Sequence, residues 1–199
     1  MNSGKIMDDS VLDHMFREAR THKAWQKKDV SPALLKALYD LLKMGPTAAN
    51  CCPARFVFIA TDEGRERLKP HLDKGNVEKT MSAPVTAIVA YDTQFYEFMP
   101  ELFPHAPSAR SWYEGKPQVI EENCMRNSSL QGAYMIMAAR SLGLDCGPMG
   151  GFNKDTLNAE FFPDGRYKAN FLCNLGYGDP AALQPRLPRL GFDQVCQVL

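Results

Sequence analysis

The stretch at residues 118–142 constrains the fold of this chain more than any other. It reads QVIEENCMRNSSLQGAYMIMAARSL, and its second half places apolar side chains on nearly every face of a helix. A helix that is apolar all round needs neighbours on all sides, so the sequence predicts a central position for it. Gly143 follows directly and is expected to end the helix.

Shorter helices and strands alternate along the rest of the chain. Helical spacing predicts helices over 10–19, 30–47, 62–72 and 153–162. Apolar runs predict buried strands over 54–61, 82–92 and 170–178, and 143–152 is expected to be a turn or a short strand. The tail, 184–199, is expected to be extended. Interleaved helices and strands without repeats favour a single α/β or α+β domain over 1–199.

The helix over 30–47 has clear signals at both ends. Ser31 is placed to cap it, Pro32 fits its first turn, and Gly45 with Pro46 should stop it. The leucines between these signals are expected to form one apolar stripe: Leu34, Leu35, Leu38, Leu41 and Leu42. Residues 95–116, in contrast, are rich in aromatics and prolines without a clean period, which is typical of a lid or an insertion.

Composition excludes several classes of function. The 199 residues carry no net formal charge, with 45% hydrophobic and 23% charged residues, so no bulk attraction to nucleic acid or to an anionic membrane is expected. No apolar run approaches the roughly 20 residues needed to cross a bilayer. The N-terminal residues lack the apolar centre of a signal peptide. These features together predict a cytoplasmic protein.

The six cysteines show no metal-binding spacing. There is no CxxC or CxxH pair, and the four histidines show no HExxH or HxH pattern, so no metal is expected. Most thiols are expected to be reduced, several of them buried. Only Cys51 and Cys52 are adjacent, which leaves a thiol-based redox sensor as one alternative function.

Familiar cofactor and nucleophile motifs are missing, and two dispersed basic clusters remain. The sequence contains no GxGxxG, GxxxxGK[ST] or GxSxG. Arg20, Thr21 and Lys23 lie near the start of the chain, and Arg186 and Arg189 near its end. Both clusters could clamp a phosphate, although composition alone favours two solvated basic patches. The glycines of GPMGG would let a backbone N–H approach a flat ligand, and a plain turn is the other interpretation.

Taken in order, five motifs resemble the flavin-dependent nitroreductase family across essentially the whole chain. They are RTHK, GPTAANCCPARF, N-x-x-K before AP, SLGLDCGPMGGF and RLPRL. Within that family, the similarity is strongest to the branch that reduces malonic semialdehyde to 3-hydroxypropionate in bacterial pyrimidine degradation. The resemblance implies a nitroreductase-like α+β sandwich, with a central, mostly antiparallel sheet flanked by helices. It also implies a homodimer with FMN at the subunit interface, with 118–142 as the dimer core.

The resemblance assigns the FMN contacts residue by residue. The phosphate would be held by Arg20, Thr21 and Lys23, joined by Arg186 or Arg189. The remaining contacts would come from Pro46, Thr47, Ala48 and Asn50 of the partner subunit, from Asn76 and Lys79 at the pyrimidine edge of the ring, and from Pro148, Met149, Gly150 and Gly151 along its other side. Lys79 would lie near N1 and O2, and the backbone N–H of Gly150 near N5. Gln184 stands where the family often has another basic residue.

The implied chemistry needs no protein nucleophile, because FMN carries the hydride that NADPH or NADH supplies. Arg110 is a candidate partner for the carboxylate of an aldehyde substrate, with Trp112 as an apolar wall. A surface charge and a packing tryptophan are equally good interpretations of these two residues. The alternative functions are a broad reductase of nitro compounds or quinones, and a flavin-binding protein with little turnover.

Overall fold

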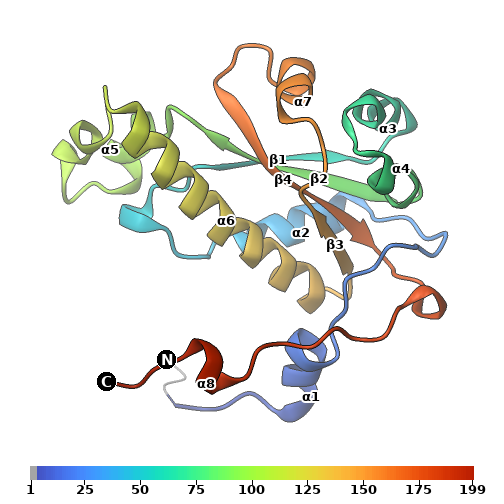
Figure 1. Ribbon diagram of the computed structural model, residues 1–199. Helices are drawn as coiled ribbons and strands as arrows, with labels where there is room; N and C mark the ends of the chain where they lie inside the picture. The colour runs from blue at the N-terminus through green and yellow to red at the C-terminus, as the bar shows by residue number, and fades with distance from the viewer. Residues whose placement is uncertain (1–3) are drawn as a thin grey trace.

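The protein, described here over residues 4–199 by a computed structural model, is built on one four-stranded antiparallel sheet (Figure 1). The strand order is β1-β2-β4-β3, and every neighbouring pair is antiparallel. The strands are β1 (Ala54–Ile59), β2 (Val85–Asp92), β3 (Asp145–Met149) and β4 (Tyr167–Gly176). The expected sheet is therefore confirmed, and the segment over 143–152 contains a strand.

Helices cover both faces of the sheet, so the fold is the expected α+β sandwich (Figure 1). Along β2, Val85, Ala87 and Val89 pack toward one face, whereas Ile88 and Ala90 pack toward the other, as the two-residue period of a strand requires. The first face is covered by α2 (Pro32–Leu42) and α6 (Pro117–Ser141). The second face is covered by α3 (Asp62–Leu68), η3 (Lys69–His71), α4 (Lys74–Met81) and α7 (Lys154–Phe161).

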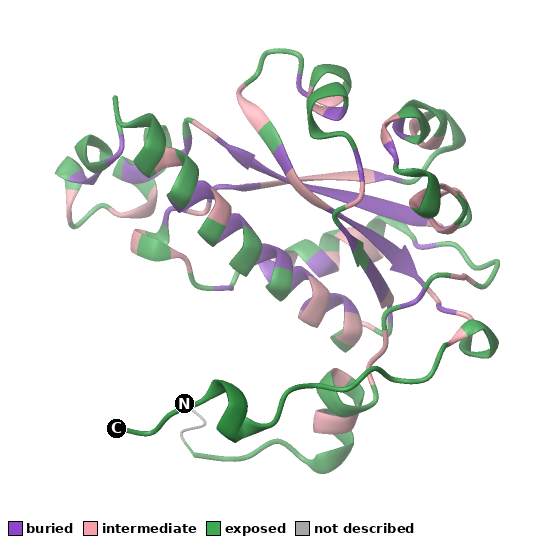
Figure 2. Cartoon of the chain, viewed as in Figure 1, coloured by how far each residue is buried: buried purple, intermediate pink, exposed green. Residues whose placement is uncertain are grey.

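The long helix α6 lies across the sheet, within one residue of its predicted bounds. Gly143 has φ of +75°, the left-handed conformation with which many helices end. Within one chain, however, only one face of α6 is buried, as the alternating colours in Figure 2 show. Leu130 and Tyr134 on its other side remain 45% and 43% exposed. The helix is therefore central, as predicted, but one of its sides is left uncovered within a single chain.

Helix α2 begins and ends as its sequence predicts. The Ser31 hydroxyl accepts a hydrogen bond from the backbone N–H of Leu34 at 3.2 Å, and Pro32 is the first helical residue. Leu38 and Leu42 are fully buried against α6 and the sheet. Leu41 departs from the predicted stripe, because it lies at its edge in the last turn and stays exposed.

Residues 4–17 and the tail lie along the same side of the molecule (Figure 1). The first helix, α1 (Asp9–Leu12), continues into a π-helical turn, η1 (Asp13–Arg17). The tail follows η6 (Pro180–Ala182) and contains one short helix, α8 (Phe192–Val195), where the sequence pattern predicts an extended chain. Across residues 4–199, no helix combines the length and apolarity that crossing a bilayer requires.

Residues 95–116 form a packed unit beside the first half of α6. The unit consists of η4 (Phe95–Phe98), α5 (Met99–Leu102) and η5 (Pro107–Trp112). Phe95, Met99 and Ala109 are fully buried in a small core of their own. Arg166 connects this unit to the end of β2, because it binds Glu97 at 3.0 Å and the fully buried carboxylate of Asp92 at 2.9 Å. Arg55 of β1 binds the same carboxylate at 2.7 Å. The interpretation as a lid stays a prediction.

Candidate functional site

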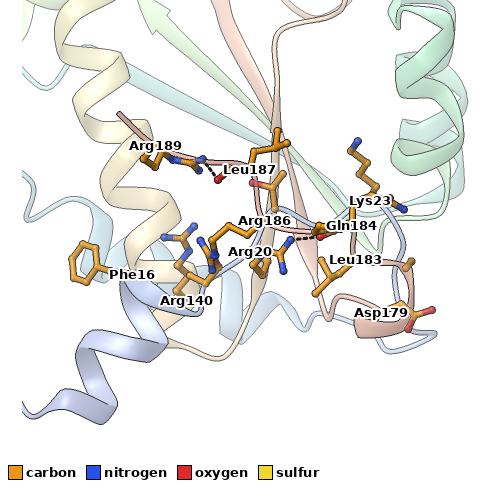
Figure 3. A pocket seen from close by; sticks show the side chains of 14 residues that line it. Phe16, Arg20, Lys23, Arg140, Asp179, Leu183, Gln184, Arg186, Leu187 and Arg189 are labelled. Carbon is orange, nitrogen blue, oxygen red and sulfur yellow. Dashed lines mark hydrogen bonds between the residues drawn. The ribbon is translucent and has the colours of Figure 1, made fainter. Parts of the chain in front are cut away.

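A cavity of about 480 Å³ opens between the N-terminal segment, the end of α6 and the tail (Figure 3). Its lining combines charged side chains with as many apolar ones. The lining residues are Phe16, Ala19, Arg20, Thr21, Lys23, Arg140, Asp179, Ala182, Leu183, Gln184, Pro185, Arg186, Leu187 and Arg189. The fold thus brings the two basic clusters, more than 160 residues apart in sequence, into one site.

The arginines of this cavity differ from every other arginine in the chain. Each of the seven arginines elsewhere pairs with an aspartate or glutamate. The remaining four of the eleven in the sequence have no such pair within residues 4–199, and all four line this cavity: Arg20, Arg140, Arg186 and Arg189. Asp179 is the one acidic residue in the lining. Like charges gathered with so little counter-charge repel each other, so the arrangement favours a bound anion.

Hydrogen bonds from arginines to backbone carbonyls join the walls of the cavity. Arg20 donates to the carbonyl of Gln184 in the tail, and Arg186 donates back to the carbonyl of Ala19 at 3.0 Å. On the other side, Arg140 donates to the carbonyl of Met15 at 2.9 Å. Each guanidinium has five N–H donors, so donors remain for a ligand after these bonds are made.

The basic segment is held against the edge strand β3. Thr21 forms a parallel bridge with Cys146, and the backbone N–H of His22 donates to the carbonyl of Cys146 at 3.1 Å. The indole N–H of Trp25 donates to the carbonyl of Lys79 at 2.9 Å. The segment therefore connects the cavity to α4.

Lys79 extends the positive charge beyond the cavity. Burial, and then the neighbouring charge of Lys23, lowers the pKa of Lys79 below its ordinary value. Two ammonium groups close enough to influence each other cost free energy unless an anion lies near both. Lys23 lines the cavity, so Lys79 adds a further cation beside the same site.

At the end of β3, a glycine allows two chain segments to approach closely. The side-chain amide of Asn76 donates to the carbonyl of Gly151 at 2.6 Å, and the backbone N–H of Asp73 donates to the same oxygen at 3.1 Å. A Cβ at Gly151 would lie 2.4 Å from Nδ2 of Asn76, so a side chain there would displace the Asn76 amide from its bond. At Gly150, in contrast, the space is open, because a Cβ there would have no neighbour within 4 Å. Pro148 is exposed beside it, whereas Met149 is buried.

Residues 46–50 lie elsewhere in the same chain. The backbone N–H of Ala48 donates to Oδ1 of Asn127 on α6 at 2.8 Å, and the amide of Asn50 donates to the carbonyl of Leu102 at 2.8 Å. Asn50 lines a second cavity, of about 430 Å³, and neither Pro46 nor Thr47 lines the first. Figure 1 shows this segment, coloured cyan, beside the half of α6 nearer α5. One chain alone does not bring these residues to the arginines.

The 46–54 segment is strained and firmly held. Ala49, Asn50 and Cys52 all have positive φ, between 38° and 51°, without being glycine. Such strain persists only where the surroundings enforce it, and it gathers at functional sites. Here buried amides from successive turns of α6 hold the segment: Asn123 contacts Sγ of Cys51 at 3.4 Å, and Gln131 accepts from the N–H of Ala54 at 2.9 Å. The segment also includes η2 (Ala48–Asn50).

Arg110 and Trp112 are not near the arginine cavity. Both lie in η5, where Arg110 donates to Glu114 through Nε at 3.1 Å and Trp112 is 46% exposed against Phe103. Arg110 thus already has a carboxylate partner within its own chain. Their role toward a substrate stays a prediction.

The thiols lack the features of a nucleophile. All six cysteines are free, and Cys51, Cys124, Cys146 and Cys173 are buried. Burial raises the pKa of Cys51, and it raises the pKa of Cys124 to about 12. Nucleophilic cysteines need the opposite shift. Within residues 4–199, no three His, Cys, Asp or Glu side chains are grouped as metal ligands.

Among the charged and aromatic residues of the cavity, sequence reasoning missed three: Arg140, Asp179 and Phe16. Arg140 carries the one charge in the apolar half of the long helix, QGAYMIMAARSL. That isolated charge was the available signal, because a lone arginine in an apolar helix must have a partner or reach solvent. Phe16 gave no signal, since the spacing of its helix assigned it to a buried face.

The fold and the site together define an α+β protein with an arginine-lined cavity and, at the end of β3, a glycine-rich segment that faces open space. Comparison with known proteins is consistent with that class. The sequence profile of the Nitroreductase family matches residues 16–177. The chain therefore belongs to the Nitroreductase family.

Similar proteins extend over nearly the full chain. A protein of Ralstonia nicotianae named "Putative NADH dehydrogenase/NAD(P)H nitroreductase" is 58% identical over 97% of this chain and 98% of its own length. A protein of the same name from Stutzerimonas stutzeri is 57% identical over 96% of each chain. Among solved structures, a nitroreductase structure from Bacillus subtilis has a TM-score of 0.88 at 19% identity, covering 96% of this chain and 100% of its own. A nitroreductase structure in complex with FMN, from Exiguobacterium sibiricum, has a TM-score of 0.85 at 19% identity, covering 98% and 99%.

Proposed function

We propose that the protein is an FMN-dependent reductase that takes electrons from NADPH or NADH. The observation that carries the proposal is the cavity whose four arginines lack acidic partners within residues 4–199. The names of the relatives, NADH dehydrogenase/NAD(P)H nitroreductase, support the reaction class. The FMN bound by the Exiguobacterium sibiricum protein supports the cofactor.

The residues of the cavity suit the phosphate of FMN. A phosphate monoester carries about two negative charges and accepts bidentate bonds from arginine. Arg20 and Arg186 are held in place by their reciprocal bonds to the opposite walls, and Lys23 and Thr21 lie beside them. These four residues form the proposed phosphate site.

The residues beyond Lys23 suit the flavin ring. Asn76, Lys79 and Gly151 are joined by the bonds described above, and the backbone at Gly150 faces open space that a flat ring requires. When bound, FMN supplies the hydride carrier that no side chain of this chain offers. Lys79 contributes an ammonium group that stabilises negative charge near it, and burial makes that stabilisation stronger than in water.

The proposal includes a homodimer, in which Pro46, Thr47, Ala48 and Asn50 reach the FMN of the partner subunit. Two observations support it. The strained 46–54 segment lies away from the arginines of its own chain. In addition, α2 and α6 expose large apolar side chains, among them Tyr39, Met44, Leu130 and Tyr134, as interface helices commonly do.

For the substrate, we propose malonic semialdehyde, on the resemblance of the motifs to that branch of the family. In this assignment Arg110 binds the substrate carboxylate and must exchange Glu114 for it. The engagement of Arg110 favours the second candidate, a reductase of nitro compounds or quinones, which have no carboxylate to bind. The relatives' names also fit this second candidate.

Flavin titration tests the proposed function. The wild-type protein should take up one FMN per chain, with the visible absorbance of oxidised flavin. Arg20→Ala should weaken FMN binding by about 2 to 3 kcal/mol, because a charge-assisted contact to the phosphate is lost. Arg17→Ala is the matched control: Arg17 lies three residues away and pairs with Asp9 and Asp13, so FMN affinity should be unchanged.

The outcome against the proposal is a protein that takes up no added FMN. A steady-state screen of aldehydes, nitro compounds and quinones with NADPH and NADH then decides the substrate. Turnover of malonic semialdehyde with poor reduction of nitro compounds selects the first candidate, and the reverse selects the second.

A further inference from the structure

The arginine cavity holds more positive charge than the phosphate of FMN can balance. Five cationic side chains line it: Arg20, Lys23, Arg140, Arg186 and Arg189. Asp179 is the one acidic residue of the lining, and its carboxylate already accepts the N–H of Ala181 at 2.9 Å. A phosphate monoester supplies about two negative charges. About two positive charges therefore remain without a partner.

The surplus charge is concentrated at one end of the cavity. In Figure 3, Arg140, Arg189 and Phe16 lie toward one end, whereas Lys23 and Gln184 lie toward the other. Arg20 joins the second end through its bond to Gln184. The proposed phosphate site thus uses the Lys23 end and leaves Arg140 and Arg189 free for another anion.

An aromatic side chain accompanies this second cationic pair. Phe16 lines the same cavity and is 56% exposed. An exposed aromatic face beside arginines is the arrangement that stacks a nucleobase while binding a phosphate. The cavity volume of about 480 Å³ also exceeds what one phosphate needs and lies in the range of nucleotide-sized ligands.

We infer that Phe16, Arg140 and Arg189 form a second subsite, which binds the 2′-phosphoadenosine end of NADPH. The 2′-phosphate is the phosphate nearest to the adenine in that molecule, so it suits a site where arginines flank an aromatic ring. NADH lacks this group. The inference rests on the proposed function and deepens it, because it makes these three residues the determinants of electron-donor specificity.

Arg140 is suited to this role by its own contacts. It donates to the carbonyl of Met15 at 2.9 Å through Nη1, while His14 contacts the Arg140 carbonyl. The bond to Met15 holds the guanidinium between α6 and η1, and within residues 4–199 Nη2 and Nε keep their donors for a ligand. Among the described residues, Arg189 bonds only to the nearby carbonyls of Leu187 and Pro188, so its remaining donors are likewise available to a phosphate.

Calorimetric titration of the FMN-loaded protein tests the inference directly. The probes are adenosine 2′-monophosphate and adenosine 5′-monophosphate, which carry the same charge and base and differ in phosphate position. The 2′-isomer should bind at least about tenfold more tightly, the scale of one good charge-assisted contact. Equal affinities would overturn the inference.

Two arginine variants and one control variant locate the subsite. Arg140→Ala and Arg189→Ala should each weaken 2′-isomer binding by about tenfold and raise KM for NADPH by a similar factor. KM for NADH and the affinity for FMN should change less than about twofold. Arg126→Ala is the matched control, since Arg126 lies on the same helix and pairs with Glu122, and it should leave all four quantities unchanged.

The KM values for the two electron donors distinguish the 2′-phosphate from the other parts of the nucleotide. An equal rise of KM for NADPH and NADH would overturn the inference in favour of a site for the diphosphate that both donors share. Because Arg189 makes only local bonds, its variant stays informative if Arg140→Ala disturbs the packing of η1. Failure of the proposed function shows itself earlier and separately, as a protein that takes up no FMN before any nucleotide is added.

Discussion

At the scale of single residues, environment decides which reactive groups can act. The adjacent thiols Cys51 and Cys52 invite a redox role, yet they differ in exposure. Cys51 is fully buried and contacts the amide of Asn123 at 3.4 Å, whereas Cys52 is half-buried and lines the second cavity. Burial raises the pKa of Cys51 and holds that of Cys124 at about 12. The reactive thiolate form is therefore suppressed at Cys51 and at Cys124.

Thiol labelling tests this assignment. With a pKa of about 12, only about one Cys124 molecule in ten thousand is a thiolate at pH 8. Iodoacetamide at pH 8 should therefore label Cys52 and Cys196 in the native protein, and all six cysteines in urea. Intact-protein mass spectrometry counts the labels, and Cys196→Ser should remove one native label. Rapid native labelling of Cys51 or Cys124 would restore the thiol-sensor alternative.

At the scale of elements, α6 shows how closely the layers of the fold are packed. Gly132 lies in the middle of this helix and faces β4. A Cβ at this position would lie 2.4 Å from the ring of Phe171 and 3.5 Å from a methyl group of Val89. The glycine thus sets the distance between the helix and the sheet, at some cost in helix propensity.

Two matched glycine substitutions should have opposite effects on stability. Gly132→Ala should lower the free energy of unfolding by about 1 to 3 kcal/mol, because overpacking against Phe171 outweighs the propensity gain. Gly75→Ala, in the first turn of α4 with nothing within 4 Å of the new Cβ, should raise it by up to about 1 kcal/mol. Urea denaturation measures both. A stabilised Gly132→Ala would show that α6 does not press on β4 in solution.

The elements also show what could be predicted from the sequence. Helices α2 and α6 were predictable, because Ser31, Pro32 and Gly143 mark their ends and their apolar patterns are strong. Helix α4 was not predicted, since no side chain caps it at Asp73. Its position depends on distant contacts, the bonds from Trp25 and Asn174 to the carbonyl of Lys79.

The candidate site was predictable only in part, because it too depends on contacts between residues far apart in the sequence. The basic clusters and the GPMGG glycines could be found as residue types, and the family resemblance gave them roles. Nothing in the sequence, however, indicates that Ala49, Asn50 and Cys52 take left-handed conformations, because such residues are normally glycine. Nor does it indicate that Arg140 faces the tail, since the fold alone joins the end of α6 to residues 179–189.

At the scale of the whole molecule, the proposed FMN site is divided between two regions of the chain. The phosphate and ring contacts gather around the arginine cavity, whereas the strained 46–54 segment is held by α6 beside the second cavity. Helix α6 also leaves an apolar side uncovered within one chain. A second copy that covers this side provides a single explanation for both features, and it makes FMN affinity depend on assembly.

One charged substitution on the uncovered side of α6 tests that dependence. Leu130 is exposed there, so Leu130→Glu should leave the chain folded while the buried charge disrupts the dimer. Light scattering should report a monomer, and FMN affinity should fall at least about tenfold because the partner's 46–50 segment is lost. Ala60→Glu, with the same charge at an exposed position after β1, should remain a dimer with unchanged affinity. A Leu130→Glu monomer that binds FMN as tightly as the wild type would place the complete site within one chain.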